Sequence, residues 1–405
     1  MNKYLITLTP VDTFFFGGEI SFNRDKKELK KGESLSEEEK KMKDFNKSFS
    51  SYIVKSNPFP QQTSLLGMLR FLILSNNDTL FDISKNKIRA GLQLDVAEEI
   101  GNSSFQLNDN DYSKMDFKKI YSISPCFLQR QTNAGWIDLF HSPFDYCLGK
   151  VSLKKGESLL DSKRQYYPDI EGYKAKDGLE KFYLGSEHNL KESDIFVEDP
   201  RIGISKNYRG KTEDNAFYKQ IFYRFSDEYK ENNTIVKHTL RFAFYAMLDY
   251  DFVKENYIVS LGGDNSRFIL KFQVLKENAD SEDLTVDFKD SIPQNSIKKD
   301  NFDCYGKVVL LSDAFLKKQD IEKCIFSINN TVSFRFLIST VDTENYYKFS
   351  GSKRLIRSDE KYNLYQKGSV FYFDNDTDLN AFEDALKTKT RFYQIGYNYF
   401  KTIKQ

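Results

Sequence analysis

The chain has 405 residues, of which 40% are hydrophobic and 29% are charged. This length exceeds what one hydrophobic core usually organises, so we expect two domains. The composition excludes a disordered, collagen-like or membrane-embedded chain. The 60 Lys and Arg nearly balance the 59 Asp and Glu, for a net charge of +1, which excludes a uniformly basic nucleic-acid coat. Any nucleic-acid site must therefore be a local patch of cations.

The first elements of the chain read as a strand, an insertion and a helix. Residues 4–10 alternate as a strand should, and three phenylalanines lead into Gly17 and Gly18, which favour a turn. Because the start lacks a long basic lead and a small-residue cleavage site, we expect a first strand of a cytoplasmic protein rather than a signal peptide. Residues 24–50 are too polar and charged to pack, which predicts a mobile insertion. Residues 65–74 form an apolar segment after the possible cap Thr63, which predicts a buried helix.

The remainder of the chain reads as strands with sparse helices, which is typical of α+β sandwiches. A polar stretch from 276 to 303 has few apolar anchors, so we place the domain boundary there and expect domains at 1–277 and 278–405. The pattern predicts strands at 120–127, 135–140, 239–248, 307–311, 332–339, 369–373 and 392–400, and a helix at 379–387.

The cations of a predicted hairpin form the best candidate for a nucleic-acid site. Arg201, Lys206, Arg209 and Lys211 surround Tyr208, and this mix of charge and aromatic ring is what single-stranded RNA binding uses. The alternative is a solvated hairpin tip balanced by Glu213 and Asp214. The fragment at 210–212 mimics the end of a P-loop, but Ser205 stands where that motif demands glycine, so we reject nucleotide hydrolysis.

Three further groups of residues are weaker candidates for phosphate binding. The turn at 261–267 offers backbone amides at Gly262 and Gly263 together with Arg267, although most such turns only join two strands. A second basic cluster holds Lys353 and Arg354, with a solvated loop as the equal alternative. Arg70, alone in the apolar helix, must find a carboxylate, a carbonyl or a phosphate, and the sequence favours none of these.

Catalytic and metal signals are thin. His141, His188 and His238 are the three histidines, and none stands in a metal-binding pattern, so we expect neither a metal nor a cofactor. The four cysteines are far apart and read as reduced thiols. His141 could act as a general base, but a hydrogen-bonded structural histidine is the more favoured interpretation.

Six segments in order resemble the third subunit of type III-B (Cmr) CRISPR effector complexes, a member of the RAMP superfamily. They are LTPVDTFFFGGEISF, NPFPQQTSLLGMLR, DPRIGISKNYRGKTEDNAFY, VSLGGDNSRF, KGSVFYF and FYQIGYNYF, and they span nearly the whole chain. The resemblance implies two ferredoxin-like (RRM-like, βαββαβ) domains with long inserted loops and hairpins. It implies a non-catalytic subunit that grips the repeat-derived 5′ tag of the guide RNA (crRNA).

The resemblance also implies partners and site residues. The partners are the large polymerase-like cyclase subunit and the first backbone subunit, with target RNA reached indirectly. By position it carries RNA contact onto Gln61, Gln62, Thr63 and Arg70 at the first helix, onto the hairpin cations, and onto Gly262, Gly263 and Arg267. Two rival hypotheses stay open. One is a metal-independent endoribonuclease that processes precursor crRNA with His141 or His188 as base, and the other is a purely structural adaptor.

Overall fold

The computed structural model describes most of the chain. The described residues are 1–18, 20–22, 52–85, 87–101, 117–156, 165–173, 176, 178–186, 188–206, 209–231, 233–275, 288, 292, 302–334, 337–339, 355–357 and 362–405. The predicted insertion at 24–50 lies outside them, as do Tyr208, Lys353 and Arg354.

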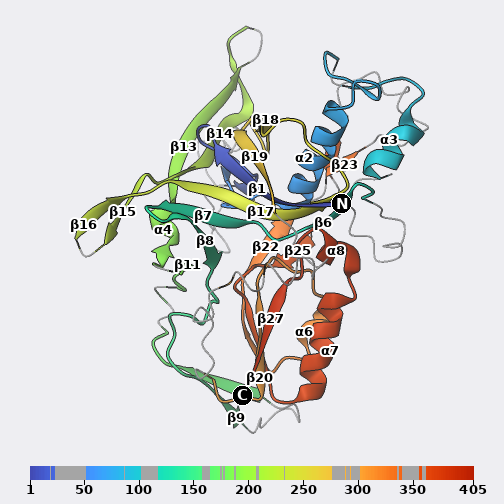
Figure 1. The fold of residues 1–405 in the computed structure, drawn as a ribbon. Helices are drawn as coiled ribbons and strands as arrows, with labels where there is room; N and C mark the ends of the chain where they lie inside the picture. Colours follow the sequence, from blue (N-terminus) through green and yellow to red (C-terminus); the bar gives the residue numbers. More distant parts are fainter. Residues whose placement is uncertain are drawn as a thin grey trace, which may run out of the picture.

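A nine-stranded sheet forms the body of the molecule (Figure 1). Its strands are β1 (Asn2–Pro10), β6 (Ile120–Ile123), β7 (Phe127–Thr132), β8 (Gly135–His141), β11 (Phe182–Leu184), β12 (Leu190–Lys191), β17 (Leu240–Leu248), β18 (Asn256–Ser260) and β19 (Arg267–Val274). They run in the order β12-β11-β8-β7-β17-β1-β19-β18, with β6 also paired to β17. The N-terminal strand β1 lies between β17 and β19, antiparallel to both. The first strand of the sequence is therefore placed near the centre by pairings more than two hundred residues apart.

Two four-stranded sheets flank this body. One contains β13 (Phe196–Lys206), β14 (Thr212–Phe225), β3 (Tyr52–Lys55) and β2 (Ile20–Phe22), in that order. The other contains β21 (Phe326–Ile328), β26 (Val370–Phe373), β20 (Gly306–Leu310) and β27 (Phe400–Lys404), in that order.

The remaining elements are short hairpins and helices. The two-stranded pairs are β4 (Phe81–Asp82) with β5 (Lys87–Ile88), β9 (Val151–Gly156) with β10 (Gln165–Ile170), β15 (Glu228–Glu231) with β16 (Thr234–Lys237), β22 (Thr331–Phe334) with β25 (Tyr362–Tyr365), and β23 (Leu337–Ser339) with β24 (Leu355–Arg357). The helices are α2 (Gln62–Ser75), α3 (Gln93–Ile100), α4 (Glu192–Ile195), α6 (Lys318–Ile321), α7 (Asp376–Lys387) and α8 (Thr390–Gln394).

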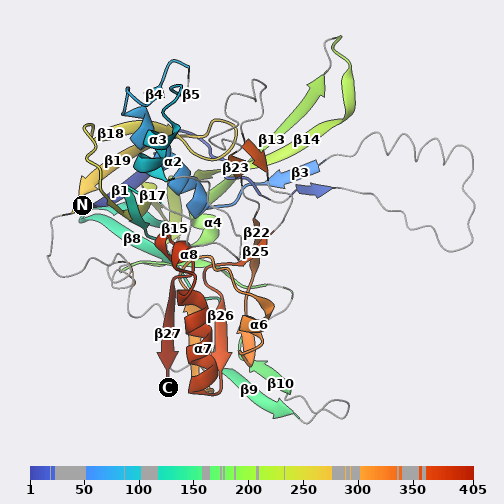
Figure 2. The ribbon, with the colours of Figure 1, turned by 90° about the vertical axis from the view of Figure 1, so that its right-hand side faces the viewer.

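Both faces of the nine-stranded sheet are covered by apolar side chains. On one face, Leu65 and Leu69 of α2 join a core with Ile6 and Phe242, all fully buried. On the other face, the ring of Phe127 lies 5.2 Å from that of Phe140, and Tyr399 of the C-terminal part joins the same cluster. The C-terminal sheet therefore packs under part of the large sheet (Figure 2). We call the large sheet with its flanking elements the N-terminal part, and residues 302–405 the C-terminal part. The two parts are joined through buried apolar side chains.

A buried ion pair also links the two parts. Asp145, just after β8, accepts a hydrogen bond from the Lys307 ammonium of β20 at 2.6 Å, and the Tyr372 hydroxyl of β26 donates to the same carboxylate at 3.1 Å. The side chains of Lys307 and Asp145 are 0% and 2% exposed. Because a buried charge is tolerated only when it is paired, this contact ties the turn after β8 to the C-terminal sheet.

The mixed α/β class, rich in strands and poor in helices, agrees with the sequence analysis. The predicted helix at 65–74 and the strand at 4–10 are confirmed by α2 and β1. The strand predicted at 392–400 is wrong, because residues 390–394 form α8 and the strand begins only at Phe400. Gly396 and Asn398 both have positive φ, which breaks extended backbone between them. The predicted pair of ferredoxin-like domains stays a prediction. No helix among the described residues is long and apolar enough to cross a membrane.

Candidate nucleic-acid interface

The segment after β1 joins the large sheet to the β13–β14 hairpin. Phe14 forms an antiparallel bridge with Tyr223 of β14, in which each backbone amide donates to the other residue's carbonyl at 2.7 and 3.0 Å. The Phe14 side chain is fully buried and lies 5.3 Å from the ring of Phe242 in β17. The run of three phenylalanines therefore fixes where the hairpin leaves the body, which its sequence alone did not indicate.

The glycine turn at 261–267 packs against this same segment. The Gly263 amide donates to the Phe15 carbonyl at 2.7 Å, and the Phe15 amide donates to the Ser266 hydroxyl at 2.9 Å. Gly262 has φ +90°, and a Cβ there would lie 2.4 Å from the Phe15 oxygen. The glycines therefore permit close approach of the chain's own backbone, and the Gly263 amide that the sequence analysis offered to phosphate is already used. Arg267 is exposed at the start of β19.

Arg201 lies beside the same segment from the hairpin side. Its guanidinium donates to the Thr13 hydroxyl and pairs with Asp199 at 3.1 Å, and it lies 4.3 Å over the ring of Phe222. These contacts hold an exposed guanidinium in one orientation, with its remaining surface open to solvent. The structure thus brings Arg201 and the 261–267 turn to opposite sides of residues 13–16, although they are far apart in sequence.

The other hairpin cations lie at the tip of a long projecting arm. Strands β13 and β14 extend well beyond the body in Figures 1 and 2. Lys206, Arg209 and Lys211 are all exposed, and Gly210 turns the chain with φ +73°. Two aliphatic residues of β13, Ile202 and Ile204, are 65% and 51% exposed on this arm. The arm therefore presents cations at its tip and apolar side chains along its length.

The start of α2 lies elsewhere, against the C-terminal part. Gln62 is 6% exposed, and its amide donates to the Ser124 carbonyl at 2.8 Å. The Gln61 side chain accepts a hydrogen bond from the Tyr397 hydroxyl at 3.1 Å, and Thr63 is partly buried. Gln62 therefore serves the fold, because a buried amide already bonded to a carbonyl offers no surface to RNA, and we leave it out of the proposed interface.

Arg70 lies about two turns further along the helix and is partly enclosed by the protein. It is partly buried, and its guanidinium lies 5.5 Å over the ring of Phe117. The cation–π contact explains how a lone arginine is accommodated in an apolar helix. The structure does not bring Arg70 to the hairpin or the glycine turn.

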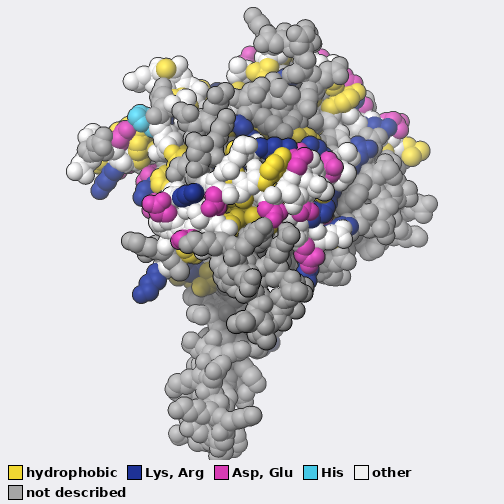
Figure 3. Space-filling view, turned by 90° about the horizontal axis from the view of Figure 1, so that it is seen from below, with side chains coloured by type: hydrophobic (Ala, Val, Ile, Leu, Met, Phe, Trp, Pro, Cys, Tyr) yellow, Lys and Arg dark blue, Asp and Glu magenta, His cyan; other side chains and the backbone are white. Residues whose placement is uncertain are grey.

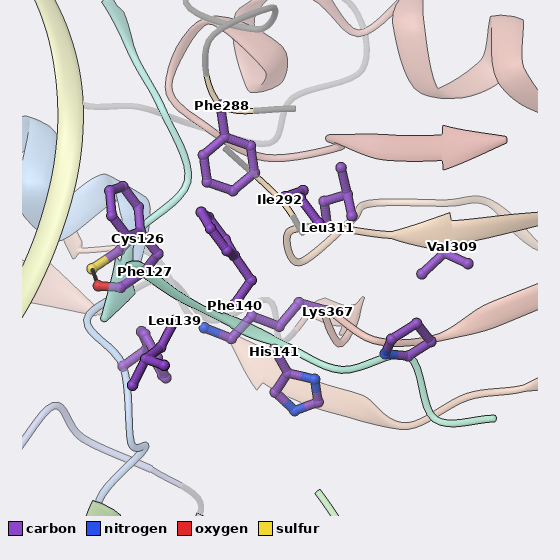
Figure 4. Close-up of a pocket in the computed structure, with 12 residues that line it drawn as sticks. Cys126, Phe127, Leu139, Phe140, His141, Phe288, Ile292, Val309, Leu311 and Lys367 are labelled. Carbon is purple, nitrogen blue, oxygen red and sulfur yellow. Dashed lines mark hydrogen bonds between the residues drawn. The ribbon is translucent and has the colours of Figure 1, made fainter. Parts of the chain in front are cut away.

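A small pocket between the two parts contains the histidine that the sequence analysis weighed as a base (Figure 4). The Nδ1–H of His141 donates to the Ser142 carbonyl at 2.6 Å. Burial, reinforced by the charge of Lys367, lowers the pKa of His141 to about 3. A general base works best with a pKa near the operating pH, so His141 is poorly suited to that role and behaves as a structural histidine. His188 is on the surface, 3.1 Å from Glu231.

Lys367 of the same pocket had no signal in the sequence. Its ammonium lies 2.9 Å from the centroid of the Phe59 ring, and burial lowers its pKa to about 8. Figure 4 shows its side chain running between Phe140 and His141. Among the described residues no cluster of three or more His, Cys, Asp or Glu is placed to hold a metal.

Charge on the face seen in Figure 3 is mixed, because Lys and Arg side chains are interleaved with Asp and Glu. This agrees with the net charge of +1.

The comparison with family models places the chain among the CRISPR-associated proteins, because the model of one such family matches residues 40–404. The chain belongs to that family, the CRISPR-associated protein family Cas_Cmr3. The resemblance stated from the sequence is therefore confirmed. A solved structure described as "Cryo-EM structure of the Type III-B Cmr-beta bound to cognate target RNA" contains a similar chain, with 14% identity and a TM-score of 0.42. The match covers 100% of this chain and 98% of that chain. No curated protein matches the sequence.

Proposed function

We propose that this chain is a non-catalytic subunit of a type III-B CRISPR effector complex and that it binds the 5′ tag of the crRNA. Family membership supports the place in such a complex. The observation that carries the RNA contact is the projecting β13–β14 arm, with Lys206, Arg209 and Lys211 exposed within six residues at its tip. On a chain of net charge +1, such a tip is where phosphate is attracted.

A second group of contacts is proposed at the base of the arm. Arg201 is held by Thr13 and Asp199 with its outer surface exposed, and Arg267 is exposed on the adjoining turn. An RNA strand laid from the base to the tip would meet cations at both ends, with Tyr208, Lys353 and Arg354 as further proposed contacts. Gly262, on the turn beside Arg267, stays in the proposal at the base of the arm. Gln61, Thr63 and Arg70 stay in it as positions that a bound strand reaches only if it extends along α2.

We also propose that the subunit docks the large polymerase-like cyclase subunit onto the first backbone subunit, as the family resemblance implies, and that it needs no cofactor. The rival endoribonuclease has less physical support at His141, because a histidine with a pKa of about 3 is too weak a base to take a proton from a ribose hydroxyl efficiently at neutral pH. RNA gripping by cations requires no such group.

The test is a pair of double variants on two projecting hairpins. Arg209→Ala with Lys211→Ala removes two tip cations, and Lys230→Ala with Lys237→Ala removes two exposed cations from the β15–β16 hairpin. We expect the first pair to weaken binding of tagged crRNA by about 1–3 kcal/mol. We also expect it to lower the slope of log affinity against log salt by about 1.4, at roughly 0.7 per phosphate contact of a single strand.

The second pair should change neither quantity. Equal affinities for the two double variants would remove the arm from the RNA site. Cleavage of repeat RNA by the purified chain, lost on His141→Ala, would support the endoribonuclease instead.

A further inference from the structure

Within the part of the chain that the structure describes, the edge of the nine-stranded sheet at β18 is open. β18 is the last strand in the sheet order, and its partner among the described strands is β19 alone. The Phe272 amide donates to the Glu255 carbonyl, and the Leu261 amide donates to the Ser266 carbonyl. The backbone amides and carbonyls of the odd-numbered residues of β18 therefore point toward β19. Because an antiparallel ladder alternates, the amides and carbonyls of Asn256, Ile258 and Ser260 point away from the sheet. Figure 2 shows β18 at the margin of the ribbon.

This edge lacks the features that usually protect one. Exposed edges are normally blunted by charge, proline, bulges or very short strands. The edge strand β13 has Pro200, Arg201, Lys206 and a register shift, and β27 has two lysines. Edge strands β2, β12 and β21 have three residues or fewer. In contrast, β18 has five residues, NYIVS, with no charge and no proline. The remaining edge strand, β6, is uncharged but has four residues and a register shift against β17. Among the described edges of the three larger sheets, β18 is therefore the one that combines five residues with none of these protective features.

Apolar side chains lie at the middle of the outward face of β18, and the exposed cations Lys271 and Arg267 of β19 lie opposite its two ends. Ile258 is 75% exposed, and its partner across the strand pair, Ile269, is 39% exposed on the same face. On the other face, the Tyr257 ring lies 5.8 Å from both Phe252 and Phe272. A residue added opposite Ile258 would form a cross-strand pair, and such pairs are strongest between β-branched or aromatic side chains.

We propose that β18 receives an extended strand from another protein subunit of the effector complex, through β-strand addition. The incoming segment would be uncharged over about three residues and would carry a β-branched or aromatic residue opposite Ile258. This inference rests on the proposed place of the chain in a complex.

The extent of the edge favours a tethered partner over a second copy of this chain. The three outward residues, from Asn256 to Ser260, span about 13 Å of strand. A contact of that length buries on the order of a few hundred Å², well below the roughly 1,200 Å² of a stable interface. A subunit already held by other contacts can add such a strand, whereas two free copies of this chain would not stay together through it.

The test compares amide hydrogen exchange in the isolated chain and in the reconstituted complex. The amides of Ile258 and Ser260 point to solvent, so they should exchange fast in the isolated chain and at least about tenfold more slowly in the complex. Exchange that stays fast in the complex would overturn the proposal. Slow exchange that depends on the concentration of the isolated chain would also overturn it, because a second copy would then be the occupant.

Variants supply an independent measurement. Ile258→Pro removes an amide that makes no bond within the sheet, and Ile258→Lys places a charge at an exposed position, so both should fold. Each should lower capture of the partner subunit at least about tenfold while binding of tagged crRNA stays unchanged. Ile269→Lys is the control, because it charges the same face on a strand that is paired on both sides. If both Ile258 variants captured the partner subunit fully, strand addition would be refuted. The proposed function is tested separately, by the RNA affinity of the Arg209→Ala, Lys211→Ala double variant.

Discussion

The buried pair between Asp145 and Lys307 provides the sharpest test of how the two parts of the chain are joined. Asp145→Ala removes the carboxylate that lies 2.6 Å from the Lys307 ammonium, whose side chain is 0% exposed. The change removes the carboxylate that pairs with this buried cation and that accepts the hydrogen bond of the Tyr372 hydroxyl. Breaking a buried pair in this way costs about 3–5 kcal/mol, so we expect the free energy of unfolding to fall by that amount.

The matched control removes both charges together. Asp145→Leu with Lys307→Met replaces the pair by apolar side chains, and it should recover most of the lost stability because neither ion is then left unpaired. Urea unfolding followed by circular dichroism measures all variants, and the coupling energy comes from the double-mutant cycle. If Asp145→Ala cost less than about 1 kcal/mol, or if the double variant were as unstable as the single one, the pair would not hold the parts together.

Three further predictions concern single side chains. Gly262→Ala should destabilise the chain by about 1–3 kcal/mol in urea, because φ is +90° and a Cβ would meet the Phe15 carbonyl, whereas Gly210→Ala, with φ +73° and nothing within 4 Å, should cost only the backbone strain. His141 has its pKa lowered to about 3, so the unfolded chain takes up a proton that the folded chain refuses as pH falls from 6.5 toward 3. Stability should fall over that window by up to about 1.4 kcal/mol per pH unit, and His141→Phe should remove this slope from the urea data. Exposed Cys147 should react with a thiol reagent at pH 8 at least about tenfold faster than Cys126, whose pKa burial raises to about 12; equal rates would contradict the buried placement.

Local signals in the sequence predicted the elements but not how they meet. The apolar run after Thr63 was enough to predict α2, because helix periodicity is a property of neighbouring residues. The strand at 392–400 failed because Gly396 and Asn398 adopt positive φ, which apolar composition does not reveal. The roles of residues 13–16 depend on pairing with Tyr223 and Gly263, which lie more than two hundred residues away. No single-sequence pattern encodes such partners.

In the candidate site too, local sequence predicted some residues correctly, whereas the environment of others depends on long-range contacts. Lys206, Arg209 and Lys211 were recognisable because charge and a glycine turn are adjacent in sequence, and the structure places these three at an exposed tip, with Arg201 at the base of the arm. Gln62 was selected by position in a resembling segment, but its amide is used by the Ser124 carbonyl. Lys367 had no signal at all, since only the fold brings it over Phe59.

The two long edges of this molecule differ in a way that separates their proposed partners. On β13, Arg201 and Lys206 disfavour the addition of another strand at the edge. The same two cations can contact phosphate, so one pair of side chains both protects the edge and suits RNA binding. The strand β18 itself has neither charge nor proline, and its outward amides and carbonyls favour a polypeptide as partner, with Arg267 and Lys271 of β19 lying opposite its two ends. Neutralising the arm should therefore affect RNA binding without affecting subunit capture, and blocking β18 should do the reverse. A variant at either edge that impaired both would show that the two contacts are not independent.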